Sequence, residues 1–328
     1  METSKEPAVA SRAPATKLGW MHSLANGART TFWLVITIIF LAEASQPYWA
    51  NAARTQMLKR FQQERKSQVI GLIHHQDSVS LLGVPVSSYI SIEDSEAVLR
   101  AIRLTPPEQP IDFILHTPGG LVLATEQIAK ALADHKGKVT VFVPHYAMSG
   151  GTLIALAADE IVMDPHAVLG PVDPQIGGLP AVSILKVLEA KKPEQVNDVT
   201  FVLADMASKS RAQVASFVEE LLLKRLPKEK AQQLATTLSE GRWTHDFPIT
   251  VEGARELGIA ISTDMPRTVY DVMDLYPQAG RGRPSVLYVP MRPGAGGAHE
   301  SPEVALPIPS VNAGGLRLPG TAGPAEGL

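Results

Sequence analysis

The sequence predicts an α/β fold built on a mostly parallel sheet. Short runs of β-branched and aromatic residues alternate with helical patterns through the middle of the chain, an order typical of parallel strands joined by crossover helices. Of the 328 residues, 45% are hydrophobic but only 5% are aromatic, as expected for aliphatic strands covered by helices. Two glycine-rich turns each follow a predicted strand, where sheets of this kind place their ligand sites.

The composition excludes several classes of function. A net charge of −3 gives no reason to expect nucleic acid as a partner. The chain has no cysteine, which excludes disulfides, thiolate catalysis and zinc sites with cysteine ligands. No His, Asp or Glu cluster has metal-ligand spacing, and neither glycine turn matches a P-loop or a dinucleotide fingerprint. We therefore expect no metal and no cofactor.

The chain divides into four predicted segments. Residues 1–28 are rich in Ser, Pro and Ala without periodicity, so we expect them to be disordered. Residues 29–50 are expected to form a transmembrane anchor, and residues 51–277 a single α/β domain. Residues 278–328 are rich in Gly and Pro, which predicts a disordered tail.

The anchor prediction rests on residues 30–49. This stretch is uncharged up to residue 42 and reaches the roughly 20 residues of a membrane span. Trp33 and Tyr48 match the aromatic belts found at the two membrane interfaces. A cleaved signal peptide, with a small-x-small site at residues 42–44, and a buried core helix are the alternatives.

Basic residues around the apolar segment predict its orientation. Lys17 and Arg29 precede it closely, whereas five basic residues follow between residues 54 and 66. The positive-inside rule then places the following domain in the cytoplasm, on a single-pass membrane protein.

Within the domain, hydrophobic periodicity predicts the elements in order. Residues 51–66 are expected to form a basic helix, and in the next helix Val98 and Ile102 share one face. Strands are expected at residues 69–73, 84–90, 111–115, 139–144 and 160–163. Helices are expected at residues 92–102, 121–132, 153–158, 211–222, 228–239 and 251–257.

Ser149 is the first candidate for chemistry. It lies between the predicted strand at residues 139–144 and the apolar helix at residues 153–158, and two glycines follow it. A serine at such a turn exposes its hydroxyl while backbone N–H groups at the helix start point outward. The sequence around Ser149 alone leaves two interpretations open, a nucleophile and a tight turn whose glycines only permit close packing.

A second turn, Thr117-Pro-Gly-Gly120, follows the preceding predicted strand. Because both turns lie at the carboxyl edge of one parallel sheet, they can supply the parts of an acyl-transfer site. Ser149 would be the nucleophile, Gly119 or Gly120 would offer one backbone N–H to an oxyanion, and Gly150 would offer a second.

These motifs carry a resemblance to a known family. His116-Thr-Pro-Gly-Gly120 and Ala147-Met-Ser-Gly-Gly-Thr152 resemble the clan of Clp protease subunits and signal peptide peptidase A. Leu169-Gly-Pro-Val-Asp-Pro-Gln175 and Trp243-Thr-His-Asp-Phe-Pro-Ile-Thr250 make the chain similar to the serine dehydrogenase proteinase family. The resemblance covers roughly residues 30–290. It implies a crotonase-like spiral of ββα units, a membrane-anchored homo-oligomer, and serine endopeptidase activity on a protein or peptide substrate.

The general base is less clearly marked in the sequence. Clp-type enzymes use a histidine after the serine, but Val172 stands at the aligned position. Signal peptide peptidase A relatives use a lysine, which burial can make basic enough at neutral pH. We expect Lys209 to be this base, in a Ser149–Lys209 dyad. The other lysines considered are Lys186, Lys191 and Lys192.

Histidines provide the remaining options. His245 could be the base, but its neighbour Asp246 cannot easily orient it, so a structural role before Pro248 is the favoured interpretation. His145 could line the cleft, and Asp173 is expected to cap or turn the chain.

Two other functions remain open at this point. The first is a catalytically inactive membrane scaffold that keeps the fold and binds partner proteins. The second is an acyl-CoA enzyme on the same fold, which the order of the motifs favours less.

Overall fold

A computed structural model describes residues 17–74, 79–81, 84–86 and 89–276 of the chain. The predicted tail at residues 278–328 lies outside this part. So do residues 1–16, which begin the segment expected to be disordered.

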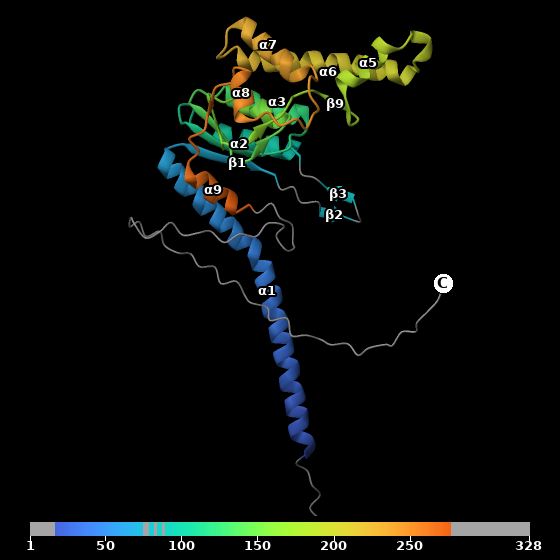
Figure 1. The fold of residues 1–328 in the computed structure, drawn as a ribbon. Helices are drawn as coiled ribbons and strands as arrows, with labels where there is room; N and C mark the ends of the chain where they lie inside the picture. Colours follow the sequence, from blue (N-terminus) through green and yellow to red (C-terminus); the bar gives the residue numbers. More distant parts are fainter. Residues whose placement is uncertain (1–16, 75–78, 82–83, 87–88, 277–328) are drawn as a thin grey trace, which may run out of the picture. The chain divides into compact units, whose positions relative to one another are not determined.

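The N-terminal part of the chain forms one continuous helix, α1 (Lys17–Arg65). The helix joins the predicted apolar segment to the predicted basic helix, and it begins at Lys17, inside the stretch expected to be disordered (Figure 1). Within the part of the chain described above, no helix is both long enough and apolar enough to cross a membrane. The span predicted at residues 29–50 is therefore not supported.

A five-stranded parallel sheet forms the centre of the domain, in the order β1-β4-β5-β7-β11. Aliphatic and aromatic side chains fill these strands, and every residue of β4 and β5 is buried, as expected for a sheet covered on both faces. The α/β fold with a parallel sheet is thus confirmed. The strands are β1 (Gln68–Ile73), β4 (Ile111–His116), β5 (Val139–Val143), β7 (Glu160–Met163) and β11 (Ile261–Ser262).

Alternate strand residues contribute to two separate cores, because successive side chains point to opposite faces of a sheet. On one face Phe113 and Val141 pack with the helices α2 (Ile92–Leu104), α3 (Val122–Ala133) and α4 (Gly150–Leu156). On the other face Ile114 and Phe142 pack with Phe61 of α1 and with α9 (Arg267–Asp274). The domain is therefore a three-layer α/β structure.

The C-terminal half of α1 is tied to this second face by polar contacts as well. Arg65 Nε donates to Asp112 Oδ2 at 2.8 Å, and Ser67 Oγ donates to the same oxygen at 2.7 Å. Thr268 of α9 donates to Glu64 Oε2 at 2.6 Å.

The remaining helices continue the first layer and extend beyond it. The predicted helix at residue 211 belongs to a longer one, α6 (Asp198–Leu222), whose first turn is capped by Asn197. α5 packs on α6, α6 packs on α7, and Figure 1 shows these three helices together at one end of the domain. The other helices of this part of the domain are α5 (Ala181–Ala190), α7 (Lys228–Ser239) and α8 (Val251–Glu256).

Short bridges join four loops in a second, smaller ladder. Thr117 pairs with Ala147, Ala147 pairs with Leu169, and Leu169 pairs with Ile249. The first two pairings are parallel and the third is antiparallel. The ladder thus brings the Thr117–Gly120 turn, the turn at Ser149, and the segments around residues 170 and 247 side by side. The short strands are β2 (Val79–Leu81), β3 (Val84–Val86), β6 (Tyr146–Ala147), β8 (Val168–Leu169), β9 (Gln175–Ile176) and β10 (Leu179–Pro180).

Candidate active site

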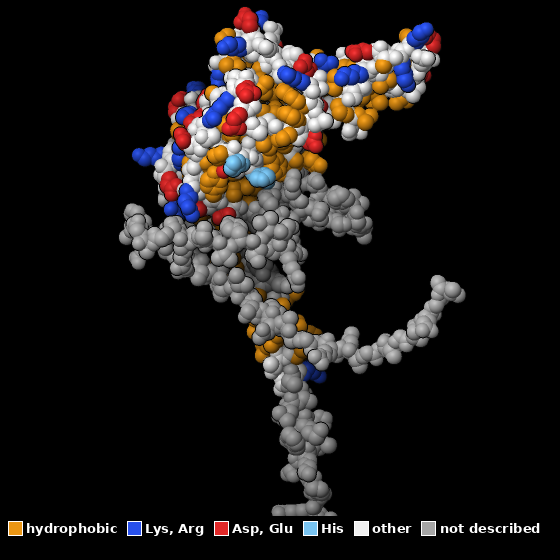
Figure 2. All heavy atoms as spheres, viewed as in Figure 1, with side chains coloured by type: hydrophobic (Ala, Val, Ile, Leu, Met, Phe, Trp, Pro, Cys, Tyr) orange, Lys and Arg blue, Asp and Glu red, His pale blue; other side chains and the backbone are white. Residues whose placement is uncertain are grey.

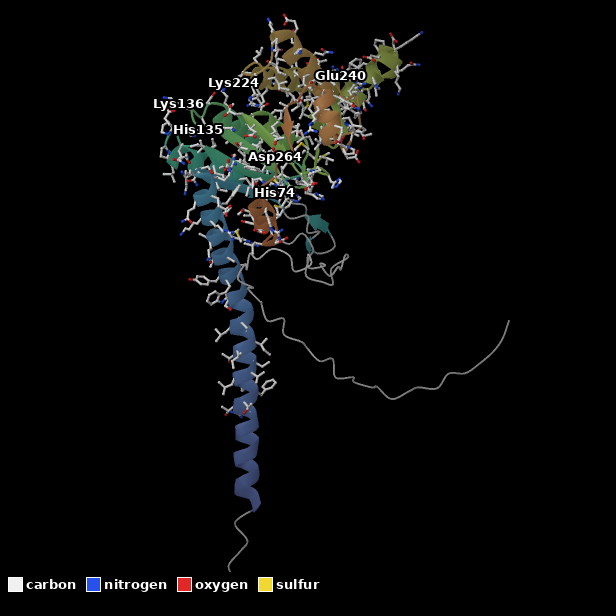
Figure 3. The ribbon with its side chains drawn as sticks, turned by 60° about the vertical axis from the view of Figure 1, so that its left-hand side comes forward. His74, His135, Lys136, Lys224, Glu240 and Asp264 are labelled. Carbon is white, nitrogen blue, oxygen red and sulfur yellow. The ribbon has the colours of Figure 1, made fainter. Side chains whose placement is uncertain are left out.

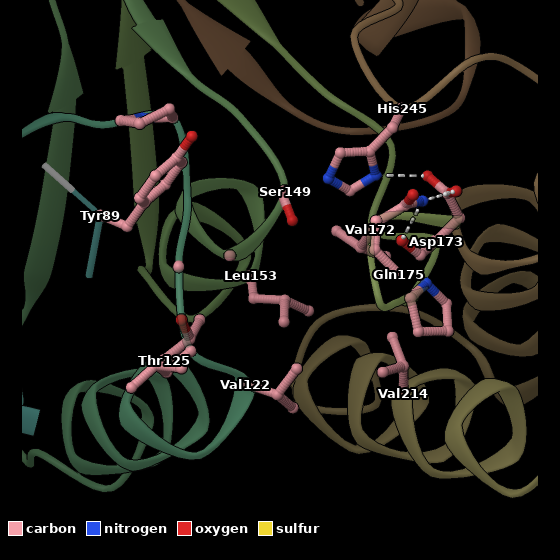
Figure 4. Close-up of a pocket in the computed structure, with 16 residues that line it drawn as sticks. Tyr89, Val122, Thr125, Ser149, Leu153, Val172, Asp173, Gln175, Val214 and His245 are labelled. Atoms are coloured by element: carbon pink, nitrogen blue, oxygen red, sulfur yellow. Dashed lines mark hydrogen bonds and ion pairs between the residues drawn. The ribbon is translucent and has the colours of Figure 1, made fainter. Parts of the chain in front are cut away.

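A cavity of about 600 Å³ lies where these four segments meet. Ser149 and Gly150 line it from one turn, Gly120 from the other, and Asp173 and His245 from the last two segments (Figure 4). The rest of its wall is largely apolar: Leu121, Val122, Leu153, Val172 and Val214, with Tyr89, Thr125 and Gln175 as polar exceptions. The cavity is large enough for a peptide side chain beside the Ser149 hydroxyl.

Ser149 has the backbone geometry of a nucleophile elbow. Its φ of 52° and ψ of −115° are unusual for a residue with a Cβ atom, and it directly precedes the first residue of α4. Its side chain makes no capping hydrogen bond and has no other partner within the described residues. The strained turn therefore holds an unpaired hydroxyl at the cavity wall.

The two glycine turns touch each other. Thr117 N donates to the carbonyl of Tyr146 at 3.2 Å, and Met148 N donates to the carbonyl of Thr117 at 3.0 Å. Gly119 has a φ of 105°, and a Cβ atom there would lie 2.8 Å from Ser149 Cβ. Only glycine permits this approach.

Two backbone amides at the cavity are unpaired among the described residues, those of Gly120 and Gly150. The third candidate, the amide of Gly119, is already used, because it donates to Thr117 Oγ1 at 3.1 Å. Gly120 and Gly150 line the cavity and Gly119 does not. Of the two donors that the sequence left open in the first turn, Gly120 is the one available to a bound oxygen.

His245 and Asp173 form a hydrogen-bonded pair in the same cavity. His245 Nδ1 lies 2.8 Å from Asp173 Oδ1, and Gln175 Nε2 donates to Asp173 Oδ2 at 2.7 Å. The Asp173 side chain is 3% exposed and that of His245 is 34% exposed. In the view of Figure 4 the imidazole lies between Ser149 and Asp173, with its second nitrogen on the Ser149 side. The pair has the arrangement of a general base held by a carboxylate.

The ladder explains how two residues so distant in sequence meet. Leu169 and Ile249 exchange both backbone hydrogen bonds, each 2.9 Å long. Asp173 lies four residues after Leu169 and His245 lies four residues before Ile249. In an antiparallel pairing these positions face each other.

The sequence alone does not reveal this pair. Asp173 was expected only to cap or turn the chain, and Asp246, considered as the partner of His245, is not its partner. The Trp243–Thr250 motif was the available signal, but the antiparallel pairing that gives it meaning is not visible in one sequence.

Lys209, the expected base, lies away from this cavity. It falls inside α6 rather than before it, and its side chain is 70% exposed. Its Nζ pairs with Asp205 Oδ2 at 2.6 Å, one helical turn earlier. Lys186, Lys191 and Lys192 are exposed as well, and no lysine is among the described residues that line the cavity. The structure thus brings Ser149, Gly120 and Gly150 together, and it does not bring Lys209 to them.

His145 is also outside the cavity lining. It is exposed, and its ring contacts those of His116 and Tyr146, with centroids 5.6 and 5.2 Å away.

Comparisons with known proteins give the family. Two proteins of Methanocaldococcus jannaschii are similar to this chain: the uncharacterized protein MJ1495, 50% identical over 79% of this chain and 89% of its own, and the uncharacterized protein MJ0137, 52% identical over 79% and 91%.

Two solved structures are similar at lower identity. ClpP1 from Listeria monocytogenes is 16% identical, with a TM-score of 0.40 over 62% of this chain and 96% of its own. A 1510-N membrane-bound stomatin-specific protease is 20% identical, with a TM-score of 0.38 over 56% and 79%. The family model of ClpP-like SDH-type serine proteinases matches residues 20–301. The chain belongs to the family of ClpP-like SDH-type serine proteinases.

Proposed function

We propose that the protein is a serine endopeptidase whose nucleophile is Ser149 and whose general base is His245. Family membership supports the reaction class. The observation that carries the assignment of residues is the cavity itself. The Ser149 hydroxyl, which is unpaired among the described residues, and the His245–Asp173 pair line this same cavity. His245 takes the role that the sequence assigned to Lys209.

The hydrogen bond to Asp173 sets the state of the base. An ionised carboxylate only accepts hydrogen bonds, so Nδ1 of His245 carries the proton and Nε2 keeps a free lone pair. Nε2 then removes the proton from Ser149 as Oγ attacks the substrate carbonyl carbon. Asp173 holds the ring and stabilises the imidazolium that forms.

The oxygen of the attacked carbonyl becomes negative, and the amides of Gly120 and Gly150 donate to it. Such preorganised donors are worth about 10²–10³ in rate each. When the intermediate collapses, the imidazolium returns its proton to the leaving amine and the acyl group stays on Ser149. Water, deprotonated by His245, then hydrolyses the ester and restores the hydroxyl.

A fluorophosphonate probe tests this proposal, because it phosphonylates activated serines. Purified full-length protein in detergent is incubated with the probe and digested, and mass spectrometry locates the adduct. We expect it on the peptide that contains Ser149, and we expect none in Ser149→Ala. Ser210→Ala, a change on α6 outside the cavity lining, should label like wild type. An unlabelled wild type would favour the alternative of a catalytically inactive scaffold.

A second part of the proposal is membrane attachment through α1. Between residues 32 and 41, nine large hydrophobic side chains are 41–71% exposed, and Figure 2 shows such side chains along the helix. Exposed apolar area of this extent on one helix favours contact with lipid. The basic residues that follow favour the cytoplasmic side for the domain.

Two measurements test the membrane attachment. Sedimentation of the full chain with membranes after carbonate washing, with release by detergent, would support it. Fractionation with the soluble proteins would contradict it. A reporter fused after residue 276 should behave as cytoplasmic.

The last part of the proposal is a homo-oligomer. Val199, Val202 and Met206 form a stripe along α6 and are 66%, 60% and 49% exposed. A second copy of the chain would cover this stripe. Light scattering in detergent tests the assembly: we expect a multimer, which Val202→Glu weakens. A monomeric wild type would contradict this part.

A further inference from the structure

Three polar residues form a chain of hydrogen bonds beside the active-site cavity but outside its lining. His74 follows β1, Asp94 lies in the first turn of α2, and Thr117 follows β4. None of them is among the described residues that line the cavity. His74 is 8% exposed and Thr117 is fully buried, so neither is open to a substrate.

Each ring nitrogen of His74 has a polar partner. His74 Nε2 lies 3.4 Å from Asp94 Oδ2, and His74 Nδ1 lies 2.8 Å from Thr117 Oγ1. The Asp94 carboxylate can only accept, so the tautomer that satisfies both contacts carries its proton on Nε2 and accepts the Thr117 hydroxyl proton at Nδ1. The backbone amide of Gly119 in turn donates to Thr117 Oγ1 at 3.1 Å.

Asp94 is itself held in place by Ser91, the N-cap residue of α2. Its Oδ2 accepts from Ser91 N at 2.8 Å and from Ser91 Oγ at 2.9 Å, and Ser91 Oγ accepts from Asp94 N at 3.2 Å. This capping box fixes the carboxylate at the start of α2. The Asp94 carboxylate therefore offers His74 an acceptor in a fixed position.

At the Thr117 end, these hydrogen bonds determine which amide of the glycine turn is free. The amide of Gly119 points to Thr117 and Gly119 takes a φ of 105°, and the amide of Gly120 is left unpaired among the described residues at the cavity. Backbone bonds hold the turn on its other side, from Ile90 N to the carbonyl of Gly119 at 2.8 Å and from Leu121 N to the carbonyl of Ile90 at 2.9 Å.

We infer that Asp94, His74 and Thr117 are positioning residues that hold the Gly120 amide ready for the oxyanion. The inference rests on the proposed function and adds to it, because it assigns a role in the reaction to residues that contact neither the substrate nor the nucleophile. Without the His74 acceptor, the Thr117 hydroxyl has, among the described residues, only the carbonyl of Gly119 left to bond, at 3.4 Å. The turn then loses the constraint that directs Gly119 away from the cavity.

Saturation kinetics with the fluorophosphonate probe separate this role from a purely structural one. The probe develops negative charge on a phosphoryl oxygen, so a displaced donor lowers the maximal rate kinact and leaves the half-saturation constant KI within about twofold. We expect Thr117→Val to lower kinact by about 10²-fold, the cost of removing one such donor. Thr117→Ser keeps the hydroxyl and should recover most of the wild-type rate.

His74→Leu provides an independent variant in case Thr117→Val does not fold. It should lower kinact by at least about 10-fold, as a small displacement of a catalytic donor does. His74→Asn should recover part of the loss, because its amide oxygen can stand where Nδ1 accepts. His135→Leu is the matched control: this histidine bonds the carbonyl of Gln109 at 2.7 Å and lies at a separate place on the domain (Figure 3).

The outcomes distinguish the inference from the proposed function. Equal kinact for wild type, Thr117→Val and His74→Leu, with Ser149 still labelled, would overturn the positioning role and leave the peptidase proposal intact. A wild type that does not label would overturn the proposed function, and the positioning role with it. Loss of kinact in Thr117→Val, with recovery in Thr117→Ser, would support the inference.

Discussion

His245 Nδ1 and Asp173 Oδ1 lie 2.8 Å apart although 72 positions separate the two residues in the sequence. Their meeting depends on the antiparallel bridge between Leu169 and Ile249, which is the last step of the small ladder beside the main sheet. The ladder starts at Thr117 and passes the turn before Ser149 at Ala147. The same ladder therefore aligns the proposed oxyanion turn, the proposed nucleophile and the proposed base.

The first prediction concerns Asp173. Asp173→Asn keeps the shape of the side chain but offers Nδ1 of His245 a group that can donate as well as accept, so Nε2 can carry the proton instead. We expect fluorophosphonate labelling of Ser149 to slow by about 10²–10⁴-fold, the range for loss of general base catalysis. Asp159→Asn is the control, because its carboxylate accepts from the Val139 amide at 2.8 Å and does not line the cavity. Equal rates for wild type and Asp173→Asn would contradict the orienting role.

The second prediction concerns the close packing behind the nucleophile. A Cβ atom on Gly150 would lie 2.5 Å from Thr125 Oγ1. Gly150→Ala should therefore lower the free energy of unfolding by about 1–3 kcal/mol, the usual cost of overpacking, and slow labelling. At Gly253 in α8 a Cβ atom would meet nothing nearer than 3.7 Å. Gly253→Ala should raise the free energy of unfolding by about 0.5–1 kcal/mol. Denaturant titration of both variants measures the contrast, and equal stabilities would contradict it.

The third prediction concerns the attachment of α1 to the sheet. Asp112 has a side chain only 3% exposed, and it accepts from Arg65 at 2.8 Å. Both the hydrogen bond to Asp112 and its charge raise the pKa of Arg65. Arg65→Met leaves a buried carboxylate whose remaining side-chain partner among the described residues is Ser67, and the change should cost about 3 kcal/mol of unfolding free energy.

Arg60→Met is the matched control for that change. The ion pair of Arg60 with Glu64 has side chains 64% and 40% exposed, so its loss should cost less than about 1 kcal/mol. Equal losses in the two variants would contradict the importance of the buried pair.

The fourth prediction concerns alkaline pH. Burial, followed by its hydrogen bond to Asp164, raises the pKa of Tyr270 to about 12. In the unfolded chain a tyrosine titrates near pH 10. The folded state therefore binds the phenol proton of Tyr270 more tightly than the unfolded chain does. Its contribution to stability is complete below pH 10 and is lost as the pH rises from about 10 to about 12.

Tyr270→Phe removes this dependence. Its free energy of unfolding should fall less steeply than that of wild type over the same pH range, and its phenolate absorbance should lack the step of highest pKa. Identical alkaline profiles for the two proteins would contradict the assignment.

The sequence predicts the parts of the site that depend on local structure. Ser149 could be found because a buried strand, a serine and two glycines follow one another closely, and the Thr117–Gly120 turn because two glycines again follow a buried strand, although Gly119 and Gly120 both stayed open as donors. The parallel sheet followed from the alternation of strands and helices. Each of these signals depends on neighbours within one turn or one strand.

The base could not be found in the same way. The pairing of Leu169 with Ile249 is long-range, and no periodicity in a single sequence encodes it. Hydrophobic periodicity predicts a helix only from residue 211, which places Lys209 before it, whereas α6 begins at Asp198 behind the cap Asn197. In the actual helix, Lys209 shares an exposed face with Asp205, one turn before it.

The most direct test of the account compares His245→Gln with Lys209→Ala, using the rate of fluorophosphonate labelling at Ser149. We expect His245→Gln to slow labelling by about 10²–10⁴-fold, as loss of a general base does, and Lys209→Ala to leave the rate unchanged. Thermal unfolding of both variants checks that the fold is retained. Normal labelling in His245→Gln together with lost labelling in Lys209→Ala would contradict the account and assign the proton transfer to the lysine.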